Sequence, residues 1–306
     1  MSESTTSFSA SRAAGHLAGL FTGVVWGLTF VSTKVLLGDF TPFEILFFRF
    51  LAAFLVLWLV RPRLLRLRSG HAFDEVLFAV AGLTGVVGYF MLENTALVFA
   101  EASHVSVVTS TSPLFIAIIA ALQNRERGIR PLFVVGFVLA ITGIALISFS
   151  GQEGDAAGLA IGTGELLALG GAILWGVYSN ILGVIADRGY ETIASIKRIF
   201  AWGLAFMVLL APFLGLTWDF SRFLVSENLA NMLFLGLVAS GVCYITWSFT
   251  VNRLGASSAG AYIYLQPAVT IVAAVLFLGE AFTWRIGLGL VLVLAGLLLS
   301  EGRFRT

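Results

Sequence analysis

Aromatic and hydroxyl side chains recur at helical spacing inside two apolar stretches of the chain. Two sets of residues follow the i, i+3, i+4, i+7 pattern of one helix face, namely Trp26, Thr29, Phe30 and Thr33, and then Trp175, Tyr178, Ser179 and Leu182. A tryptophan in the middle of an apolar helix needs a partner inside the protein for its ring N–H. Core packing explains either ring alone. Because the two rings recur as a pair, the pattern favours the wall of a polar cavity.

Polar residues in other apolar stretches extend this candidate cavity. In a bilayer, a polar side chain in mid-span is expected to face protein or a water-filled space. Tyr89 lies in the stretch 74–98, Tyr244 and Trp247 lie in 229–252, and Tyr262 and Gln266 are one helical turn apart in 257–278. The predicted substrate-binding side chains are Trp26, Thr29, Tyr89, Trp175, Tyr178, Tyr244, Trp247, Tyr262 and Gln266.

Four ionisable residues are candidates for recognition of charge or for coupling to protons: Arg49, Arg198, Glu93 and His104. A cation in mid-bilayer costs roughly 3 to more than 10 kcal/mol. Each arginine is therefore expected either to bond two helices together or to bind a substrate carboxylate. Glu93 is expected either near the outer end of its helix or as a neutral group in proton coupling. His104 is expected as a satisfied polar residue or as a proton relay.

Two prolines mark places where membrane helices are expected to bend. Pro113 follows a run of hydroxyl residues between Ser106 and Ser112, and Pro267 directly follows Gln266. Proline removes a backbone hydrogen bond, and nearby hydroxyls satisfy backbone groups of their own helix. We predict hinges at Pro113 and Pro267, whereas the hydroxyl run also has a purely structural explanation.

The sequence lacks patterns typical of enzymes, metal sites and nucleotide-driven pumps. It contains three histidines and one cysteine, Cys243, and it has no HExxH, GxSxG, CxxC or Walker pattern. We therefore expect no catalytic residue, no metal and no cofactor. A pairing of His104 with a serine is the enzymatic alternative that stays open. A channel is disfavoured because no selectivity-filter pattern is present.

The elements that position these residues are expected to be membrane-spanning helices. The chain of 306 residues is 58% apolar and 11% charged, with a mean hydropathy of +0.97. A soluble domain does not tolerate this composition. Since a spanning helix needs about 20 apolar residues, the sequence predicts ten spans. They are 15–36, 42–60, 74–98, 103–123, 131–149, 163–186, 193–214, 229–252, 257–278 and 284–300.

Basic residues gather in one set of the connections between these spans. If the N-terminus is cytoplasmic, twelve basic residues face the cytoplasm and only Lys34, Arg222 and Arg285 face the other side. This asymmetry satisfies the positive-inside rule. We therefore predict a multi-pass protein of the inner (cytoplasmic) membrane with both termini in the cytoplasm. The basic clusters then contact lipid, and nucleic-acid binding is not expected. The oligomeric state is left open, with a monomer as one option.

The chain repeats itself over five predicted spans. Four of the repeated residues are Trp26, Gly27, Arg49 and Pro113, which recur as Trp175, Gly176, Arg198 and Pro267. A repeat with an odd number of spans crosses the membrane in the opposite sense the second time, as in many secondary transporters. We predict a cytoplasmic tail (1–13), a first repeat (14–150), an external linker (151–162), a second repeat (163–301) and a second cytoplasmic tail (302–306).

The first span of each repeat carries small residues at every fourth position. These residues are Gly15, Gly19, Gly23 and Gly27 in the first repeat, and Gly164, Ala168, Ala172 and Gly176 in the second. Small residues at this spacing let another helix approach closely. They indicate ordinary packing, the surface on which the two halves meet and slide, or a contact in a homodimer. Their presence in both halves favours an internal contact over a homodimer.

Taken in order, these motifs resemble the EamA family of the drug/metabolite transporter superfamily. The resemblance rests on Trp-Gly at 26–27, Arg-Phe-Leu-Ala-Ala at 49–53, Thr-Ala-Leu-Val-Phe-Ala-Glu-Ala-Ser at 95–103, Pro113 and Glu126. It also rests on a second copy of these motifs, which includes Gln266-Pro267, Gly279-Glu280 and Gly296. In length and number of spans the chain is most similar to the YddG-type amino-acid exporters.

The resemblance implies a fold and a function. The implied fold is an all-α polytopic membrane protein with ten transmembrane helices in two inverted five-helix repeats. The implied function is alternating-access export of small metabolites, aromatic or hydrophobic amino acids foremost. Another class of metabolite is the alternative cargo.

Overall fold

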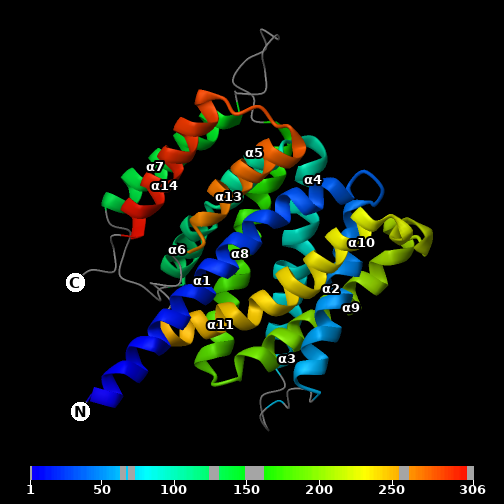
Figure 1. Ribbon diagram of the computed structural model, residues 1–306, viewed down its shortest axis with the longest axis horizontal. Helices are drawn as coiled ribbons and strands as arrows, with labels where there is room; N and C mark the ends of the chain where they lie inside the picture. The colour runs from blue at the N-terminus through cyan, green and yellow to red at the C-terminus, as the bar shows by residue number, and fades with distance from the viewer. Residues whose placement is uncertain are drawn as a thin grey trace.

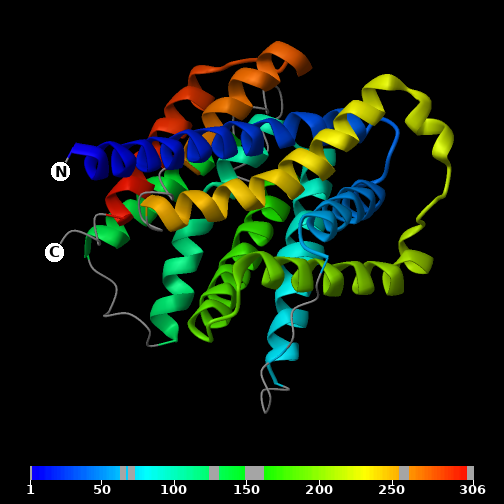
Figure 2. The ribbon, with the colours of Figure 1, turned by 60° about the horizontal axis from the view of Figure 1, so that its bottom comes forward.

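The apolar runs of the sequence form long helices in the computed structural model, which describes residues 2–62, 67, 73–123, 131–148, 162–254 and 262–301. In chain order the helices are α1 (Ser2–Leu36), α2 (Pro42–Val60), α3 (Asp74–Ala81), η1 (Gly82–Gly88), α4 (Tyr89–Phe99), α5 (Ala102–Thr109), α6 (Ser112–Leu122), α7 (Pro131–Ser148), α8 (Thr163–Asp187), α9 (Thr192–Leu214), η3 (Phe220–Leu224), α10 (Ser226–Leu233), η4 (Phe234–Val242), α11 (Cys243–Leu254), α13 (Leu265–Ala273), η5 (Ala274–Leu278) and α14 (Trp284–Glu301). Figures 1 and 2 show their arrangement.

Seven helical stretches of the described chain are long and apolar enough to cross a membrane. They are Ala13–Leu36, Pro42–Val60, Asp74–Phe99, Ala102–Leu122, Thr163–Asp187, Thr192–Leu214 and Ser226–Val251. Three shorter apolar helices, Pro131–Ile147, Leu265–Leu278 and Trp284–Leu299, lie where the other three spans are predicted. The protein is therefore a helical membrane protein, and the count of ten spans stays a prediction.

Some predicted features lie outside the described residues. These are the tail 302–306, Glu126, and the linker 151–162 apart from Gly162. The predicted N-terminal tail, by contrast, is helical from Ser2 onward and continues into the first span as part of α1.

Local sequence signals set the start of α2. Thr41 precedes Pro42, and its hydroxyl accepts a hydrogen bond from the Glu44 backbone N–H at 3.2 Å, while the Glu44 carboxylate accepts one from the Thr41 N–H at 2.9 Å. This reciprocal cap satisfies two backbone donors that a helix start leaves unpaired. Proline suits the first turn because it has no N–H to lose.

The first helices of the two halves, α1 and α8, run in opposite directions. Near the end of α1, Lys34 donates a hydrogen bond of 2.8 Å to the Ala100 carbonyl. Near the start of α8, Gly164 also approaches Ala100. The C-terminal end of α1 and the N-terminal end of α8 therefore meet at one end of the bundle, as an inverted repeat requires. We call it the distal end, and the end where α1 starts the proximal end.

The contacts between the two halves are symmetric: the first helix of each half packs on equivalent helices of the other half. Helix α1 packs on α11 and α13 of the second half, and α8 packs on α4 and α6 of the first half. The last helices of the halves, α7 and α14, lie side by side at the edge of the bundle in both views (Figures 1 and 2). The cross-contacts place spans of both halves around the centre of the molecule.

The small-residue ridges lie on these contacts between the halves. A Cβ atom at Gly23 would come within 2.5 Å of the Tyr262 carbonyl oxygen, and one at Gly27 within 2.8 Å of that of Gln266. In the second half, a Cβ at Gly176 would come within 2.9 Å of the Phe115 side chain. The ridges are thus the surface where the halves meet. Whether they also slide there stays a prediction.

The two predicted hinge prolines directly follow interruptions in their spans. Helix α5 ends at Thr109 and α6 starts at Ser112, with Pro113 in its first turn. The hydroxyl of Ser112 donates a 2.6 Å hydrogen bond to the Thr109 carbonyl across this break. Pro267 lies in the first turn of α13, after a turn at residues 262–264. The predicted positions coincide with real breaks, and motion at them stays a prediction.

Two spans contain π-helical segments at equivalent places of the two halves. In the first half, η1 begins at Gly82 and leads directly into Tyr89. In the second half, η4 contains Gly236 and leads into Cys243 and Tyr244. Segments of this kind are uncommon and often lie at functional sites. Because a π-helical turn holds more residues than an α-helical turn, the tyrosine after each segment lies on a different face of its span than regular α-helical periodicity predicts.

Candidate functional site

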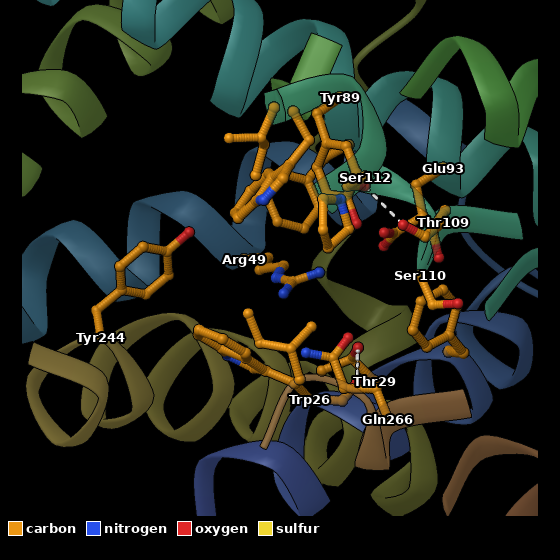
Figure 3. A pocket seen from close by; sticks show the side chains of 16 residues that line it. Trp26, Thr29, Arg49, Tyr89, Glu93, Thr109, Ser110, Ser112, Tyr244 and Gln266 are labelled. Carbon is orange, nitrogen blue, oxygen red and sulfur yellow. Dashed lines mark hydrogen bonds between the residues drawn. The ribbon is translucent and has the colours of Figure 1, made fainter. Parts of the chain in front are cut away.

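A cavity lies at the centre of the bundle between the two halves. It has a volume of about 720 Å³ including its open part. Its walls come from spans of both halves, with these lining residues: Trp26, Thr29, Phe30, Arg49, Tyr89, Phe90, Glu93, Thr109, Ser110, Ser112, Pro113, Ile116, Trp175, Tyr244, Ile263 and Gln266. Figure 3 shows the Arg49 side chain among the residues of this central cavity. A mainly apolar cavity with a few polar groups is the usual form of a small-molecule site.

A second cavity adjoins the first on the proximal side, with a volume of about 900 Å³ including its open part. Its lining reaches helix ends at Tyr190, Thr192 and Val251. Tyr178 and Trp247, both predicted as binding residues, line this proximal cavity and not the central one. The path from the proximal end to the centre of the protein therefore passes through this space.

Three aromatic residues line both cavities: Trp26, Trp175 and Tyr244. The rings of Trp26 and Tyr244 are 6.1 Å apart between centroids. The Trp175 ring lies 4.7 Å from that of Tyr89 and 5.0 Å from that of Tyr178. Rings at these distances are in edge or tilted contact. They form the boundary between the central and the proximal cavity.

The predicted need of Trp26 for a partner inside the protein is met. Its ring N–H donates a hydrogen bond of 3.0 Å to the Ala239 carbonyl in η4. This bond ties the first span to the π-helical segment of the opposite half and fixes the ring in the cavity wall. Thr29 lines the central cavity, but its hydroxyl donates to its own helix at the Trp26 carbonyl, at 2.6 Å.

Arg49 is a buried cation in the wall of the central cavity and is 3% exposed. Its Nε donates a hydrogen bond of 2.6 Å to the Ser240 hydroxyl, which joins α2 to η4. Its guanidinium carbon lies 4.4 Å from the centroid of the Phe90 ring, a cation–π distance. The bond to Ser240 fits the predicted bond between helices, and the position in the cavity fits the alternative role toward a carboxylate.

Glu93 also lies in the wall of the central cavity and is 3% exposed. It attracts Arg49 electrostatically. The neighbouring Asn94 does not line the cavity. Its side-chain amide donates a hydrogen bond of 3.0 Å to the Pro42 carbonyl and so joins α4 to α2. The central cavity thus has one acidic and one basic group in its wall.

Three of the predicted site residues lie outside the linings of both cavities. Tyr262 packs on α1, and its hydroxyl lies 2.6 Å from Nδ1 of His16. Arg198 pairs with Glu75 and thereby joins α9 to α3. His104 lies 3.0 Å from Glu165 and joins α5 to α8. The last two contacts fit the structural readings of Arg198 and His104.

Hydrogen bonds and ion pairs join helices at the distal end of the bundle. Glu280, from the segment before α14, accepts hydrogen bonds from the backbone N–H groups of Ala102 at 2.6 Å and Ser103 at 3.1 Å. It therefore caps the start of α5 in the opposite half. Arg222 pairs with Glu44 at 2.8 Å, and this hydrogen bond raises the pKa of Arg222 above its ordinary value.

Sequence reasoning did not assign the partners of these charged groups. The partners are Ser240 for Arg49, Glu75 for Arg198 and Glu44 for Arg222. They lie 191, 123 and 178 positions away along the chain. The only available signal was the need of each embedded charge for some partner. Within the described residues, no group of three His, Cys, Asp or Glu side chains is placed to hold a metal ion.

Known proteins resemble this chain over almost all of its length. An "Uncharacterized transporter" of Archaeoglobus fulgidus is 26% identical over 94% of this chain and 97% of its own. A "Probable amino-acid metabolite efflux pump" of Salmonella typhimurium is 27% identical over 96% of this chain and 97% of its own. A "Probable terminal-alkyne amino-acid exporter" of Streptantibioticus cattleyicolor is 28% identical over 78% of this chain and 77% of its own.

A solved crystal structure has the same fold, with a TM-score of 0.66 and 21% identity over 96% of this chain and all of the other. The model of the EamA-like transporter family matches the chain twice, at residues 13–149 and 162–301. The two matches follow one another along the chain and together cover most of the sequence. The protein is a multi-pass membrane transporter and belongs to the EamA-like transporter family.

Proposed function

We propose that this chain is an alternating-access carrier that exports amino acids with aromatic or hydrophobic side chains across the bacterial inner membrane. The observation that carries the proposal is the central cavity between the inverted halves, which combines a ring-lined wall with a few polar and charged groups. Rings bury an apolar side chain, and the polar groups orient the other end of the cargo.

The asymmetry between the ends of the bundle supports alternating access. The distal end is held by the Glu280 cap and the Arg222–Glu44 pair, whereas the proximal cavity leads inward from the helix ends. Arg61 and Arg188 lie at the proximal end, where they pair with Glu191 and Asp74. Basic residues at this end agree with a cytoplasmic location of the termini, so the cargo enters from the cytoplasm.

The direction and the class of cargo also draw on the relatives. Two of them carry the words "exporter" and "efflux pump" in their names, and both names refer to amino acids or their metabolites. Transport coupled to the gradient of a solute needs no nucleotide, which agrees with a sequence that has no Walker pattern.

Counterflow in proteoliposomes tests this proposal. Vesicles with purified protein are preloaded with one unlabelled solute and placed in a low concentration of the same labelled solute, over a panel of amino acids, nucleobases and sugars. We expect saturable counterflow of phenylalanine, tryptophan and leucine, and only background accumulation of the sugars and nucleobases.

Two outcomes would count against the proposal. Counterflow restricted to nucleobases or sugars would assign another class of cargo to the same carrier. A flux of amino acids that rises linearly with concentration, without exchange of internal for external solute, would indicate a channel.

A further inference from the structure

One nitrogen of Arg49 has no partner although the side chain is buried in the cavity wall. Nε is bonded to Ser240, and the guanidinium plane lies by Phe90, yet Nη1 has no hydrogen-bond acceptor within the described part of the chain. A charged donor that is buried without an acceptor is costly. Ser240 and Phe90 hold the guanidinium in place, and the Arg49 side chain lies in the lining of the central cavity (Figure 3).

The opposite charge in the same wall belongs to Glu93. It attracts Arg49 electrostatically, yet within the described residues the two side chains make no ion-pair contact. A buried pair intended only for stability would be expected to close into direct contact, because separation leaves both charges desolvated. Two opposite charges in the lining of one cavity, without direct contact, instead suit a ligand that carries both signs.

Aromatic rings form part of the remaining lining of the central cavity. Trp26, Tyr89 and Trp175 line it together with Phe90. We propose that the central cavity recognises the free zwitterion of an α-amino acid. Its carboxylate accepts a hydrogen bond from Arg49 Nη1, its ammonium group donates one to the Glu93 carboxylate, and its side chain lies among the rings. This assignment rests on the proposed function and narrows its cargo to amino acids in which both charged groups are free.

Three matched ligands test the assignment on the purified protein. Phenylalanine has both charged groups, phenethylamine lacks the carboxylate, and 3-phenylpropionate lacks the ammonium group. Binding is measured by equilibrium dialysis of labelled ligands. Because a hydrogen bond to a charged group contributes about tenfold or more in affinity, we expect phenylalanine to bind the wild-type protein at least about tenfold more tightly than either analogue.

Two substitutions assign each charge to its half of the ligand. In Arg49→Gln, the affinity for phenylalanine is expected to fall about tenfold or more, while the affinity for phenethylamine does not fall. In Glu93→Gln, the affinity for phenylalanine falls likewise, while that for 3-phenylpropionate does not. The matched control is Arg198→Gln, the repeat counterpart of Arg49 outside the cavities, which is expected to leave the ratios of the three affinities unchanged.

The outcomes separate this inference from the proposed function. If the wild-type protein binds the analogues as tightly as phenylalanine, or Arg49→Gln weakens all three ligands equally, the zwitterion assignment is wrong even where counterflow of phenylalanine is saturable. If no ligand of the series binds and no amino acid shows counterflow, both the zwitterion assignment and the proposed function are wrong. The wild-type ligand series needs no variant, so an unstable variant does not prevent the test.

Discussion

Replacement of both Trp26 and Trp175 by alanine is expected to abolish saturable transport. Each ring lines both the central and the proximal cavity, so the double variant opens the boundary between the two spaces and removes two apolar surfaces from the cargo. Burial of one such ring contributes about 1.5–3 kcal/mol. The loss of two rings is therefore expected to lower the apparent affinity about a hundredfold or more, so counterflow no longer saturates over the concentrations at which that of the wild-type protein does. Counterflow of phenylalanine over a range of concentrations measures the effect.

Two further variants show whether the rings themselves are responsible. Trp26→Phe with Trp175→Phe keeps an aromatic wall but loses the N–H bond from Trp26 to Ala239, so an intermediate rate is expected. Trp284→Ala removes an indole that is 68% exposed and lies outside both cavities, so wild-type counterflow is expected. Wild-type counterflow in the folded double alanine variant would remove these two residues from the site.

Gly27→Ala is expected to destabilise the protein, against the usual effect of alanine in a helix. Alanine normally favours an exposed helix interior by about 0.5–1 kcal/mol over glycine. A Cβ at Gly27, however, would lie 2.8 Å from the Gln266 carbonyl oxygen and 2.7 Å from the Val269 Cβ, and backbone cannot move aside cheaply. Overpacking of this kind costs about 1–3 kcal/mol. Thermal unfolding in detergent, followed by tryptophan fluorescence, measures the change.

The matched control is Gly170→Ala in α8. There, the only close neighbour of a new Cβ is the end of the Leu92 side chain at 3.3 Å, which is flexible. This variant is expected to unfold at the wild-type temperature or above it. If Gly27→Ala raised the unfolding temperature as much as Gly170→Ala does, α1 and α13 could not approach each other as closely as described.

The membrane fold follows from the sequence because its signals are local or repeated. Continuous apolar runs predict the spans, and Gly15, Gly19, Gly23 and Gly27 occur every fourth residue as a contact between helices demands. The repeat predicts the inversion, since five is odd. The recurrence of Trp26 as Trp175 predicts that both rings lie in a cavity wall, and both line the central cavity.

The remaining details depend on contacts between distant segments. Regular helical periodicity predicts Tyr262 on the same face as Gln266. Helix α13 starts only at Leu265, however, so Tyr262 lies in a preceding turn and contacts His16. Arg198 forms an ion pair with Glu75, whereas its counterpart Arg49 lines the central cavity. The π-helical segments before Tyr89 and Tyr244 also change the face on which each tyrosine lies, and regular periodicity does not reveal them.

The central claim is that cargo binds in the central cavity and reaches it from each side of the membrane in turn. Ser110 lines this cavity and is 4% exposed, and the only cysteine of the chain is Cys243. The measurement is the rate at which a membrane-impermeant thiol reagent labels Ser110→Cys in a Cys243→Ala background, applied to either face. We predict labelling from both faces, slowed by phenylalanine with saturation. Labelling from one face only, or at a rate that saturating phenylalanine leaves unchanged, would contradict the claim.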